Sequence, residues 1–320
     1  MTPTISICIA AYNVESYISE CLLSIFEFEN SIPKEIIVVD DCSNDNTVKI
    51  VKSMIENYPE QNIVLIENYQ NLWPAGSYNK AVESSHGKYI TFLDSDDFLI
   101  KSGLPKKIEI LENNSKLQMI YANGVFFEKW TQGLQIQWHM NRLLTWSILD
   151  IQTKLFTTIP MLSVSCSVMR REFFDQIGGF DPMCQSNDWV LNIRIFQHLI
   201  SSDSFSYILD PVFAYRMHEN NISKDSNKMI KLLKEVVDHY IPLKYKDKQY
   251  ANIYFFTALN GIAARRYRES LRLFRISLSF EYHPTRIFIY ILAVISPVSF
   301  MASHFPKFFS FLKKIVQRLT

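Results

Sequence analysis

Short apolar runs alternate with helical patterns over the first hundred residues. Runs at residues 5–10, 35–39, 63–66 and 89–93 are each too short for a helix and predict buried strands. Between them, apolar residues recur three or four positions apart, which predicts helices at about residues 18–26, 45–58 and 75–85. This order of elements predicts an α/β fold with a Rossmann-like, mostly parallel sheet and flanking helices.

Acidic residues follow two of the predicted strands. Asp40 and Asp41 come directly after the second strand, and Asp94, Asp96 and Asp97 come after the fourth. Ligands of such sheets bind beyond the carboxyl ends of the strands. We therefore expect these acids to lie together in a binding site.

The pattern changes after residue 101. The sequence predicts a strand at residues 119–127, a less periodic loop at 131–160, a helix at 188–199 and closing strands at 205–209 and 212–217. From about residue 228 the chain reads as helical, and residues 251–280 resemble a helical hairpin.

The C-terminal segment has a composition of its own. Residues 287–302 are almost wholly apolar but fall short of the roughly 20 residues that span a bilayer. Residues 308–319 follow with one apolar and one basic face, and residues 282–320 hold five basic residues and no acidic one. This composition is typical of a helix lying in a membrane interface.

Overall composition narrows the class of protein. The 320 residues are 48% hydrophobic and 20% charged, which indicates a folded chain of more than one unit. A net charge of +1 argues against a nucleic-acid partner. The five cysteines are scattered and form no CxxC pair, which favours reduced thiols and a cytoplasmic location.

The acidic turn after the fourth strand carries the strongest chemical signal. Three carboxylates within residues 94–97 repel one another, so a partly buried arrangement of them needs a cation. Oxygen ligands of this kind suit Mg²⁺ or Mn²⁺ held together with substrate phosphates. A solvated acidic turn that caps the next helix is the alternative, but a second acid pair beside a neighbouring strand disfavours it.

The two acids after the second strand, Asp40 and Asp41, can have different roles. One carboxylate of Asp40 and Asp41 can hydrogen-bond a base or ribose edge, and the other can stabilise the turn. A helix-capping cluster would explain Asn44 and Asp45, but it would not require two adjacent acids at a strand end.

Several motifs occur in the order found in family 2 inverting glycosyltransferases of the bacterial surface-polysaccharide type, which the chain resembles over residues 3–225. The motifs are ICIAAYN at 7–13, VVDDCSND at 38–45, KYITFLDSDD at 88–97, GGFDP at 178–182, NDW at 187–189 and YRMH at 215–218. The resemblance implies the GT-A fold, with a nucleotide-sugar half at 1–100 and an acceptor half at 101–225. A helical region at 226–282 and a basic amphipathic, membrane-associating tail at 283–320 complete the expected organisation.

The resemblance also implies roles for individual residues. Asp188 would be the catalytic base, and the metal, Mn²⁺ or Mg²⁺, would be held by Asp94, Asp96 and His218. Tyr12 would stack on the nucleobase and Asp41 would hydrogen-bond it. The residues expected to bind the nucleotide-sugar are Ala10, Tyr12, Asp41, Asn79, Asp94 and Ser95.

The chain departs from the family pattern at two places. The family usually has Glu before the base, and this chain has Asn187. The family pattern N-x-G-x-x-x-A-R-N is met here by Asn71, Trp73 and the run Ser77-Tyr78-Asn79, without the arginine. We therefore expect altered hydrogen bonding to the acceptor and one cationic contact fewer to the nucleotide.

The expected function follows from the resemblance. The enzyme would move a sugar from a nucleotide-diphosphate sugar, with UDP-sugars favoured, to a hydroxyl of a saccharide or lipid-linked acceptor in surface-polysaccharide synthesis (O-antigen or capsule). The tail would hold it peripherally on the cytoplasmic face of the cell membrane.

Two alternatives come from other classes of protein. A nucleotidyltransferase would need a basic, glycine-rich loop after the first strand, but the AAYN segment at 10–13 has neither glycine nor lysine. The same segment excludes a GxGxxG dehydrogenase. A non-catalytic, sugar-binding relative would have lost the base or the metal motif, and Asp94, Asp96 and Asp188 are all present.

Overall fold

The computed structural model describes residues 2–28, 32–100, 103–127, 135–137, 146–158, 162–185, 187–219, 221 and 225–295. It divides into two compact units, residues 1–153 with 160–219 and residues 154–159 with 220–320. The described part of the loop expected at 131–160 instead contains a short strand at 135–137 and a helix at 148–157, so that expectation was wrong there. The rest of that segment and the tail after residue 295 lie outside the described residues.

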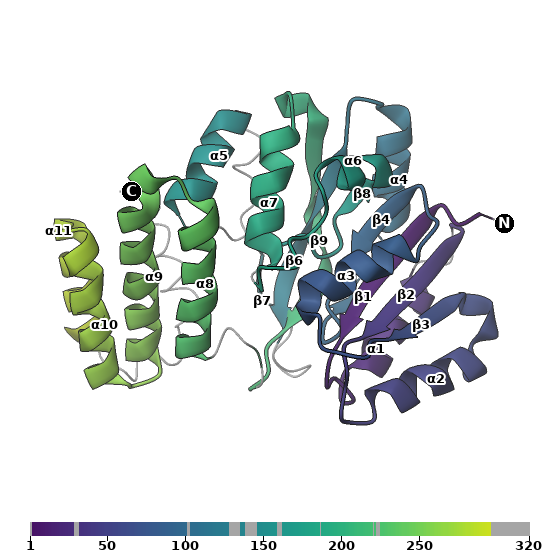
Figure 1. Cartoon of the computed structure of the whole chain (residues 1–320), viewed down its shortest axis with the longest axis horizontal. Helices are drawn as coiled ribbons and strands as arrows, with labels where there is room; N and C mark the ends of the chain where they lie inside the picture. Colours follow the sequence, from purple (N-terminus) through teal and green to yellow (C-terminus); the bar gives the residue numbers. More distant parts are fainter. Residues whose placement is uncertain are drawn as a thin grey trace. The chain divides into compact units, whose positions relative to one another are not determined.

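The first unit begins with the predicted alternation of strands and helices (Figure 1). Its first elements are β1 (Ile5–Ala11), α1 (Ile18–Phe28), β2 (Lys34–Asp40), α2 (Thr47–Asn57), β3 (Ile63–Glu67), α3 (Trp73–Glu83) and β4 (Tyr89–Phe92). The four strands pair in parallel in the order β3-β2-β1-β4. The carboxyl ends of β2 and β4, and the acids that follow them, therefore lie at one edge of the sheet, as predicted.

The remaining elements extend this sheet. They are β5 (Phe98–Leu99), α4 (Leu104–Asn113), β6 (Met119–Phe127), β7 (Gln135–Gln137), α5 (Ile148–Thr157), β8 (Val168–Arg170), α6 (Arg171–Gln176), α7 (Asn187–His198) and β9 (Phe205–Arg216). Within the described residues the sheet has nine strands in the order β3-β2-β1-β4-β8-β6-β9-β5, with β7 paired to β6. Antiparallel pairing of β8 with β4 and β6 makes the sheet mixed, beside the parallel half formed by β1 to β4.

One prediction about this region was wrong. We expected two closing strands separated at Asp210 and Pro211, but β9 is a single strand over 205–216. The pairing of β6 with β9 shifts register near Asn123 and accommodates the proline without ending the strand.

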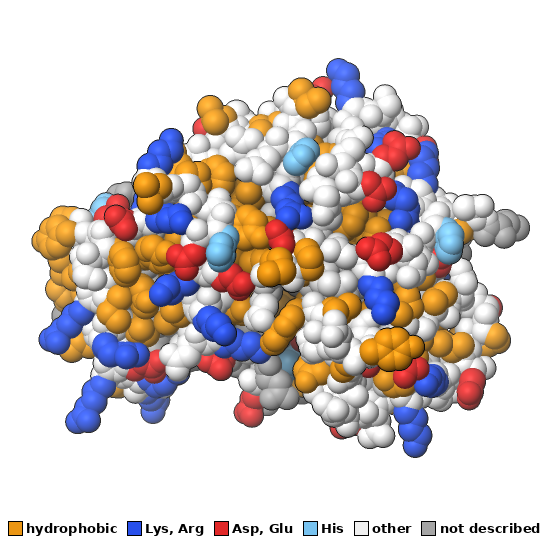
Figure 2. All heavy atoms as spheres, viewed as in Figure 1, with side chains coloured by type: hydrophobic (Ala, Val, Ile, Leu, Met, Phe, Trp, Pro, Cys, Tyr) orange, Lys and Arg blue, Asp and Glu red, His pale blue; other side chains and the backbone are white. Residues whose placement is uncertain are grey.

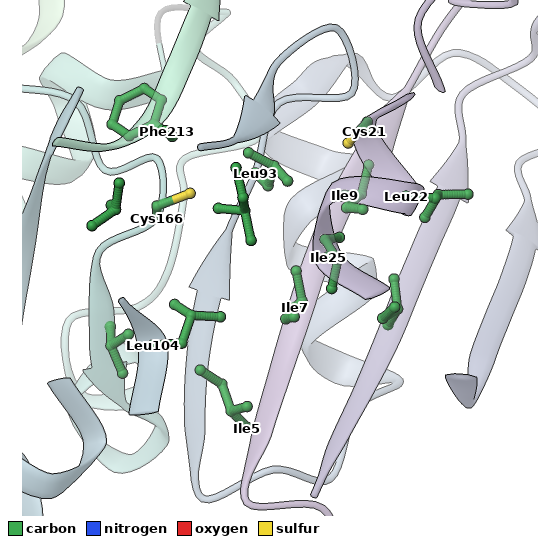
Figure 3. Close-up of a cluster of buried hydrophobic side chains, with 14 of the residues drawn as sticks. Ile5, Ile7, Ile9, Cys21, Leu22, Ile25, Leu93, Leu104, Cys166 and Phe213 are labelled. Atoms are coloured by element: carbon green, nitrogen blue, oxygen red, sulfur yellow. The ribbon is translucent and has the colours of Figure 1, made fainter. Parts of the chain in front are cut away.

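The core lies under the first strands. Ile5, Ile7 and Ile9 alternate along β1 and enter a buried cluster with Leu22 and Ile25 of α1 (Figure 3). Helical spacing on α1 therefore predicted its buried face correctly. A second aromatic group, in which the rings of Tyr78, Phe92, Phe174 and Phe180 contact one another, ties α3 to β4 and to the turn after α6.

The second unit contains helices α8 (Ser226–Tyr240), α9 (Leu243–Ala263), α10 (Tyr267–Phe280) and α11 (Pro284–Ile295). Helices α9 and α10 form the predicted hairpin and pack through a cluster that includes Leu259 and Leu273. Among the described helices, none combines the length and the apolar composition needed to cross a bilayer.

Candidate active site

The acidic turn joins β4 to β5 at the carboxyl edge of the sheet. The backbone N–H of Asp97 donates to the carbonyl of Asp94 at 3.0 Å, which closes the turn. Ser95 and Asp97 are buried, whereas Asp94 and Asp96 are partly exposed. The carboxylates of Asp94 and Asp96 are therefore accessible at this edge, and that of Asp97 is buried.

Asp94 is held by two hydroxyl groups. Tyr78 donates to its Oδ1 at 2.7 Å, and Ser165 donates to its Oδ2 at 2.8 Å. Burial and the neighbouring charge of Asp96 raise the pKa of Asp94, while the two hydroxyl hydrogen bonds act in the opposite direction. Both carboxylate oxygens thus have fixed positions.

Asp96 lies beside His218, as the resemblance implied. His218 Nε2 is 2.9 Å from Asp96 Oδ2, and the imidazole ring stacks on Tyr17 with ring centroids 4.6 Å apart. The structure therefore brings together two of the three predicted metal ligands, although their residues are 122 positions apart.

Asp97 has a different environment. Its Oδ1 accepts the backbone N–H of Arg216 at 2.8 Å, and its buried Oδ2 has no hydrogen-bond partner among the described residues. Burial, followed by the charges of Asp96 and Asp94, raises the pKa of Asp97 well above its usual value. Arg216 lies in the YRMH motif, which by itself indicated no role for the arginine.

Asp188 stands in the first turn of α7. Its Oδ2 accepts the backbone N–H of Val164 at 3.4 Å, and Asn192 on the next turn donates to the Asp188 carbonyl at 2.6 Å. Burial, and then the negative charge of Asp94, raises the pKa of Asp188 to about 7. A carboxylate with this pKa is suited to accept a proton near neutral pH.

The two acids after β2, Asp40 and Asp41, make different contacts. Asp40 accepts the Ser43 N–H through Oδ2 at 3.0 Å and so stabilises the turn. Asp41 accepts Leu72 N–H at 2.7 Å and Asn68 Nδ2 at 2.8 Å, both through Oδ1. Oδ1 of Asp41 is therefore engaged within the protein.

Tyr12 and Ala10 stand at the end of β1. Tyr12 is 48% exposed and Ala10 is partly exposed, so both residues are accessible to a ligand. Trp73, at the start of α3, is also 43% exposed. In the sequence, Trp73 stands out only as a departure from the family pattern.

Asn79 has a different environment from the one we expected. Its Nδ2 donates to the carbonyl of Phe180 at 2.9 Å, and its Oδ1 accepts the Phe180 N–H at 3.0 Å. A Cβ on Gly179 would lie 2.8 Å from Asn79 Oδ1, so the glycine permits this close approach. We therefore give Asn79 a structural role and leave it out of the proposed donor site.

Asp96 and His218, with Asp94 nearby, are the residues that could take part in holding a divalent cation. Within the described residues no group of three or more His, Cys, Asp and Glu side chains is arranged to hold a metal by itself. A carboxylate and an imidazole at 2.9 Å can occupy adjacent positions around one ion, and Asp94 lies on the same turn. Mn²⁺ and Mg²⁺ are often bound through one or two carboxylates, with substrate phosphates completing the coordination.

Comparison with known proteins places the chain in a family. The model of Glycosyl transferase family 2 matches residues 6–178. An uncharacterized glycosyltransferase of Methanocaldococcus jannaschii is 26% identical over 79% of this chain and 84% of its own length. A poly(ribitol-phosphate) beta-glucosyltransferase of Bacillus spizizenii is 37% identical over 38% of this chain, and the match spans only 20% of that enzyme.

Solved structures share the fold. Residues 1–349 of TarS from S. aureus, in complex with UDP-GlcNAc, superpose with a TM-score of 0.55 at 19% identity, over 92% of this chain and 82% of that one. The mannosyltransferase PcManGT of Pyrobaculum calidifontis, in complex with GDP-Man and Mn²⁺, gives a TM-score of 0.58 at 16% identity, over 95% and 84%. Because the family model matches more than half of the chain, the protein belongs to glycosyl transferase family 2, and its sheet has the GT-A fold.

Proposed function

We propose that this enzyme transfers a hexose from a UDP-sugar to a hydroxyl group of a saccharide or lipid-linked acceptor, with inversion at the anomeric carbon. The observation that carries the proposal is the position of Asp188. The carboxyl group of Asp188 lies close enough to Asp94 for the charge of Asp94 to help raise its pKa to about 7. The turn that holds Asp94 also holds Asp96, which contacts His218. A general base therefore adjoins the candidate diphosphate site.

Each side chain has a defined task in this mechanism. The ionised Asp188 takes the proton of the acceptor hydroxyl while that oxygen attacks the anomeric carbon. The bond between the anomeric carbon and the diphosphate breaks in the same step, so the configuration inverts and UDP leaves. Tyr12 stacks on the uracil and Asp41 Oδ2 accepts a hydrogen bond from it.

Asp94, Asp96 and His218 would hold the divalent cation. When bound, Mn²⁺ or Mg²⁺ neutralises the negative charge that develops on the leaving diphosphate. Tyr78 and Ser165 fix both oxygens of Asp94, and Tyr17 fixes the ring plane of His218. In this proposal residues 1–100 bind the donor and residues 101–225 bind the acceptor.

Surface charge supports a peripheral location on an anionic membrane surface. Residues 220–320 hold 17 Lys and Arg against 6 Asp and Glu, whereas residues 1–219 hold 16 against 26. Basic and apolar side chains gather over the helices of the second unit on the face shown in Figure 2. Exposed apolar residues of α11 are Phe288, Ile291 and Val294, and exposed arginines of α10 are Arg268, Arg272 and Arg275.

We therefore propose that the second unit, together with the tail after residue 295, holds the enzyme on the cytoplasmic face of the cell membrane. Poly(ribitol-phosphate) is the acceptor named for several relatives. A surface-polysaccharide acceptor such as an O-antigen or capsule chain, assembled at that membrane, is the acceptor class that we propose here.

The experiment that tests the catalytic proposal measures nucleoside diphosphate release. Purified enzyme is incubated with UDP-, GDP- and dTDP-sugars, with Mn²⁺, with Mg²⁺ and with EDTA. Metal-dependent release from one donor, lost in Asp96→Ala, would support the proposal and identify the sugar. Absence of both release and metal-dependent donor binding would favour a non-catalytic sugar-binding protein instead.

A further inference from the structure

Arg216 contacts the acidic turn at several points from the last position of β9. Only 9% of the residue is exposed, and its guanidinium lies over the rings of Tyr17, Phe98 and Phe127, at 5.2, 4.9 and 5.4 Å from their centroids. An aromatic enclosure of this kind removes water from around the cation and strengthens its remaining polar contacts.

The polar contacts of Arg216 involve two consecutive residues of the turn. Its Nε donates to the carbonyl of Asp96 at 2.8 Å, and its backbone N–H donates to Asp97 Oδ1 at 2.8 Å. Its terminal nitrogen donates to Glu20 Oε2 of α1 at 2.6 Å. The guanidinium is thus fixed at one end by Glu20 and fixes the turn at the other.

The same arginine is connected to the imidazole that faces Asp96. Tyr17 lies between them, with Arg216 over its ring and His218 stacked on it. One side chain therefore determines where the main chain of Asp96 lies and supports the ring that carries His218 Nε2.

We propose that Arg216, held by Glu20, is a positioning residue that sets the Asp96–His218 pair at the geometry needed to bind a divalent cation. The inference rests on the proposed function for the metal. It differs from a purely structural role, which would affect stability alone. It also differs from a purely electrostatic role, because removing a nearby positive charge would by itself favour cation binding.

Two substitutions separate these roles. Arg216→Gln removes the charge, whereas Arg216→Lys keeps the charge but loses the planar group that joins Asp96 to Glu20. If positioning dominates, both substitutions weaken cation binding. If charge dominates, Arg216→Gln binds the cation more tightly and Arg216→Lys is close to wild type.

A matched control lies elsewhere on the sheet. Arg171 also makes several hydrogen bonds, to the carbonyls of Gly87 and Val82 and to the hydroxyls of Ser85 and Ser6. These contacts tie together α3, β1 and α6 and involve none of the acids of the turn. Arg171→Gln should lower the thermal stability without changing metal affinity.

The test measures Mn²⁺ binding in the presence of UDP by electron paramagnetic resonance of free Mn²⁺, together with the melting temperature of each variant. We expect both Arg216 variants to raise the Kd for Mn²⁺ about tenfold or more, and Glu20→Gln to raise it less. Arg171→Gln should bind Mn²⁺ with the wild-type Kd, even if its melting temperature falls as much as that of the Arg216 variants or more.

Two outcomes would overturn the inference, and they can be told apart. If the wild type binds Mn²⁺ and both Arg216 variants bind it equally tightly or more tightly, the positioning role alone is overturned. A wild type that binds no Mn²⁺ with UDP would remove the metal from the proposed function as well. If the Arg216 variants do not fold, the comparison of Glu20→Gln with Arg171→Gln decides the question.

Discussion

The Tyr78 hydroxyl donates a 2.7 Å hydrogen bond to Asp94 Oδ1, at the sequence position where the family pattern has an arginine. A neutral hydroxyl here stabilises the ionised carboxylate less than a guanidinium would. This agrees with a raised pKa for Asp94, for which burial is the main cause. Asp94 therefore receives a hydrogen bond from this position but no positive charge.

Removal of that hydroxyl should move the acidic limb of the pH profile. In Tyr78→Phe the pKa of Asp94 should rise further, so that kcat/KM falls at acidic pH and recovers at higher pH. The measurement is kcat/KM from about pH 5 to 9 at saturating metal. Tyr89→Phe is the control, because the Tyr89 hydroxyl contacts Arg170 and not the acidic turn. An unchanged profile in Tyr78→Phe would contradict this prediction.

The base should show its own pH dependence. Since Asp188 must be ionised to accept a proton and its pKa is about 7, kcat/KM should fall as the pH drops below about 7. Asp188→Asn should lower kcat by about 10²- to 10⁴-fold while metal-dependent donor binding persists. Exposed Asp175 on α6 provides the control substitution Asp175→Asn. Activity in Asp188→Asn within threefold of wild type, about 0.7 kcal/mol of barrier, would identify another base.

The ionised carboxylate of Asp188 should also lower the free energy of unfolding. Because burial raises its folded-state pKa from 3.8 to about 7, ionised Asp188 destabilises the fold above pH 7, and this penalty disappears as the pH falls towards 4. Asp188→Asn should therefore be more stable than wild type by about 1–3 kcal/mol near pH 8, and equal to it near pH 4. Thermal unfolding at both pH values, without metal, checks this. A less stable Asp188→Asn at pH 8 would contradict it.

Asn79 should matter for folding more than for donor binding. Its loss leaves the N–H and carbonyl of Phe180 without the side chain that satisfies both. We expect Asn79→Ala to lose about 1–3 kcal/mol of stability, with the KM for the donor nearly unchanged. Asn57→Ala on the exposed side of α2 is the matched control. A large rise in donor KM at unchanged melting temperature would return Asn79 to the donor site.

Membrane association should depend on α10 and on the tail. Replacing Arg268, Arg272 and Arg275 by Gln should reduce binding to vesicles that contain anionic phosphatidylglycerol, since each basic residue near such a surface contributes about 1 kcal/mol. High salt should reproduce the loss, and vesicles of neutral phosphatidylcholine should bind neither protein strongly. Deleting residues 305–320 should weaken binding further. Undiminished flotation of both variants would contradict a role for these segments.

The sequence predicted the parts of the site that depend on local patterns. The short apolar runs predicted the strands, and parallel strands bring their carboxyl ends to one edge of a sheet. The common location of the acids after β2 and β4 could therefore be predicted. Long-range partners had no comparable signal. Ser165 and Tyr78 meet Asp94 through the fold, and Asn79 was assigned from a motif although its amide binds the main chain of Phe180.

The ion pair of Glu20 with Arg216 joins residues 196 positions apart. During synthesis, residues 1–100 emerge long before Arg216, so the acidic turn first exists without the guanidinium that holds it. Contacts of such separation also slow folding, because the intervening chain must be ordered before they form. The proposed donor site should therefore be among the last parts of its unit to become native, and chains that end before Arg216 should bind nucleotide sugars weakly.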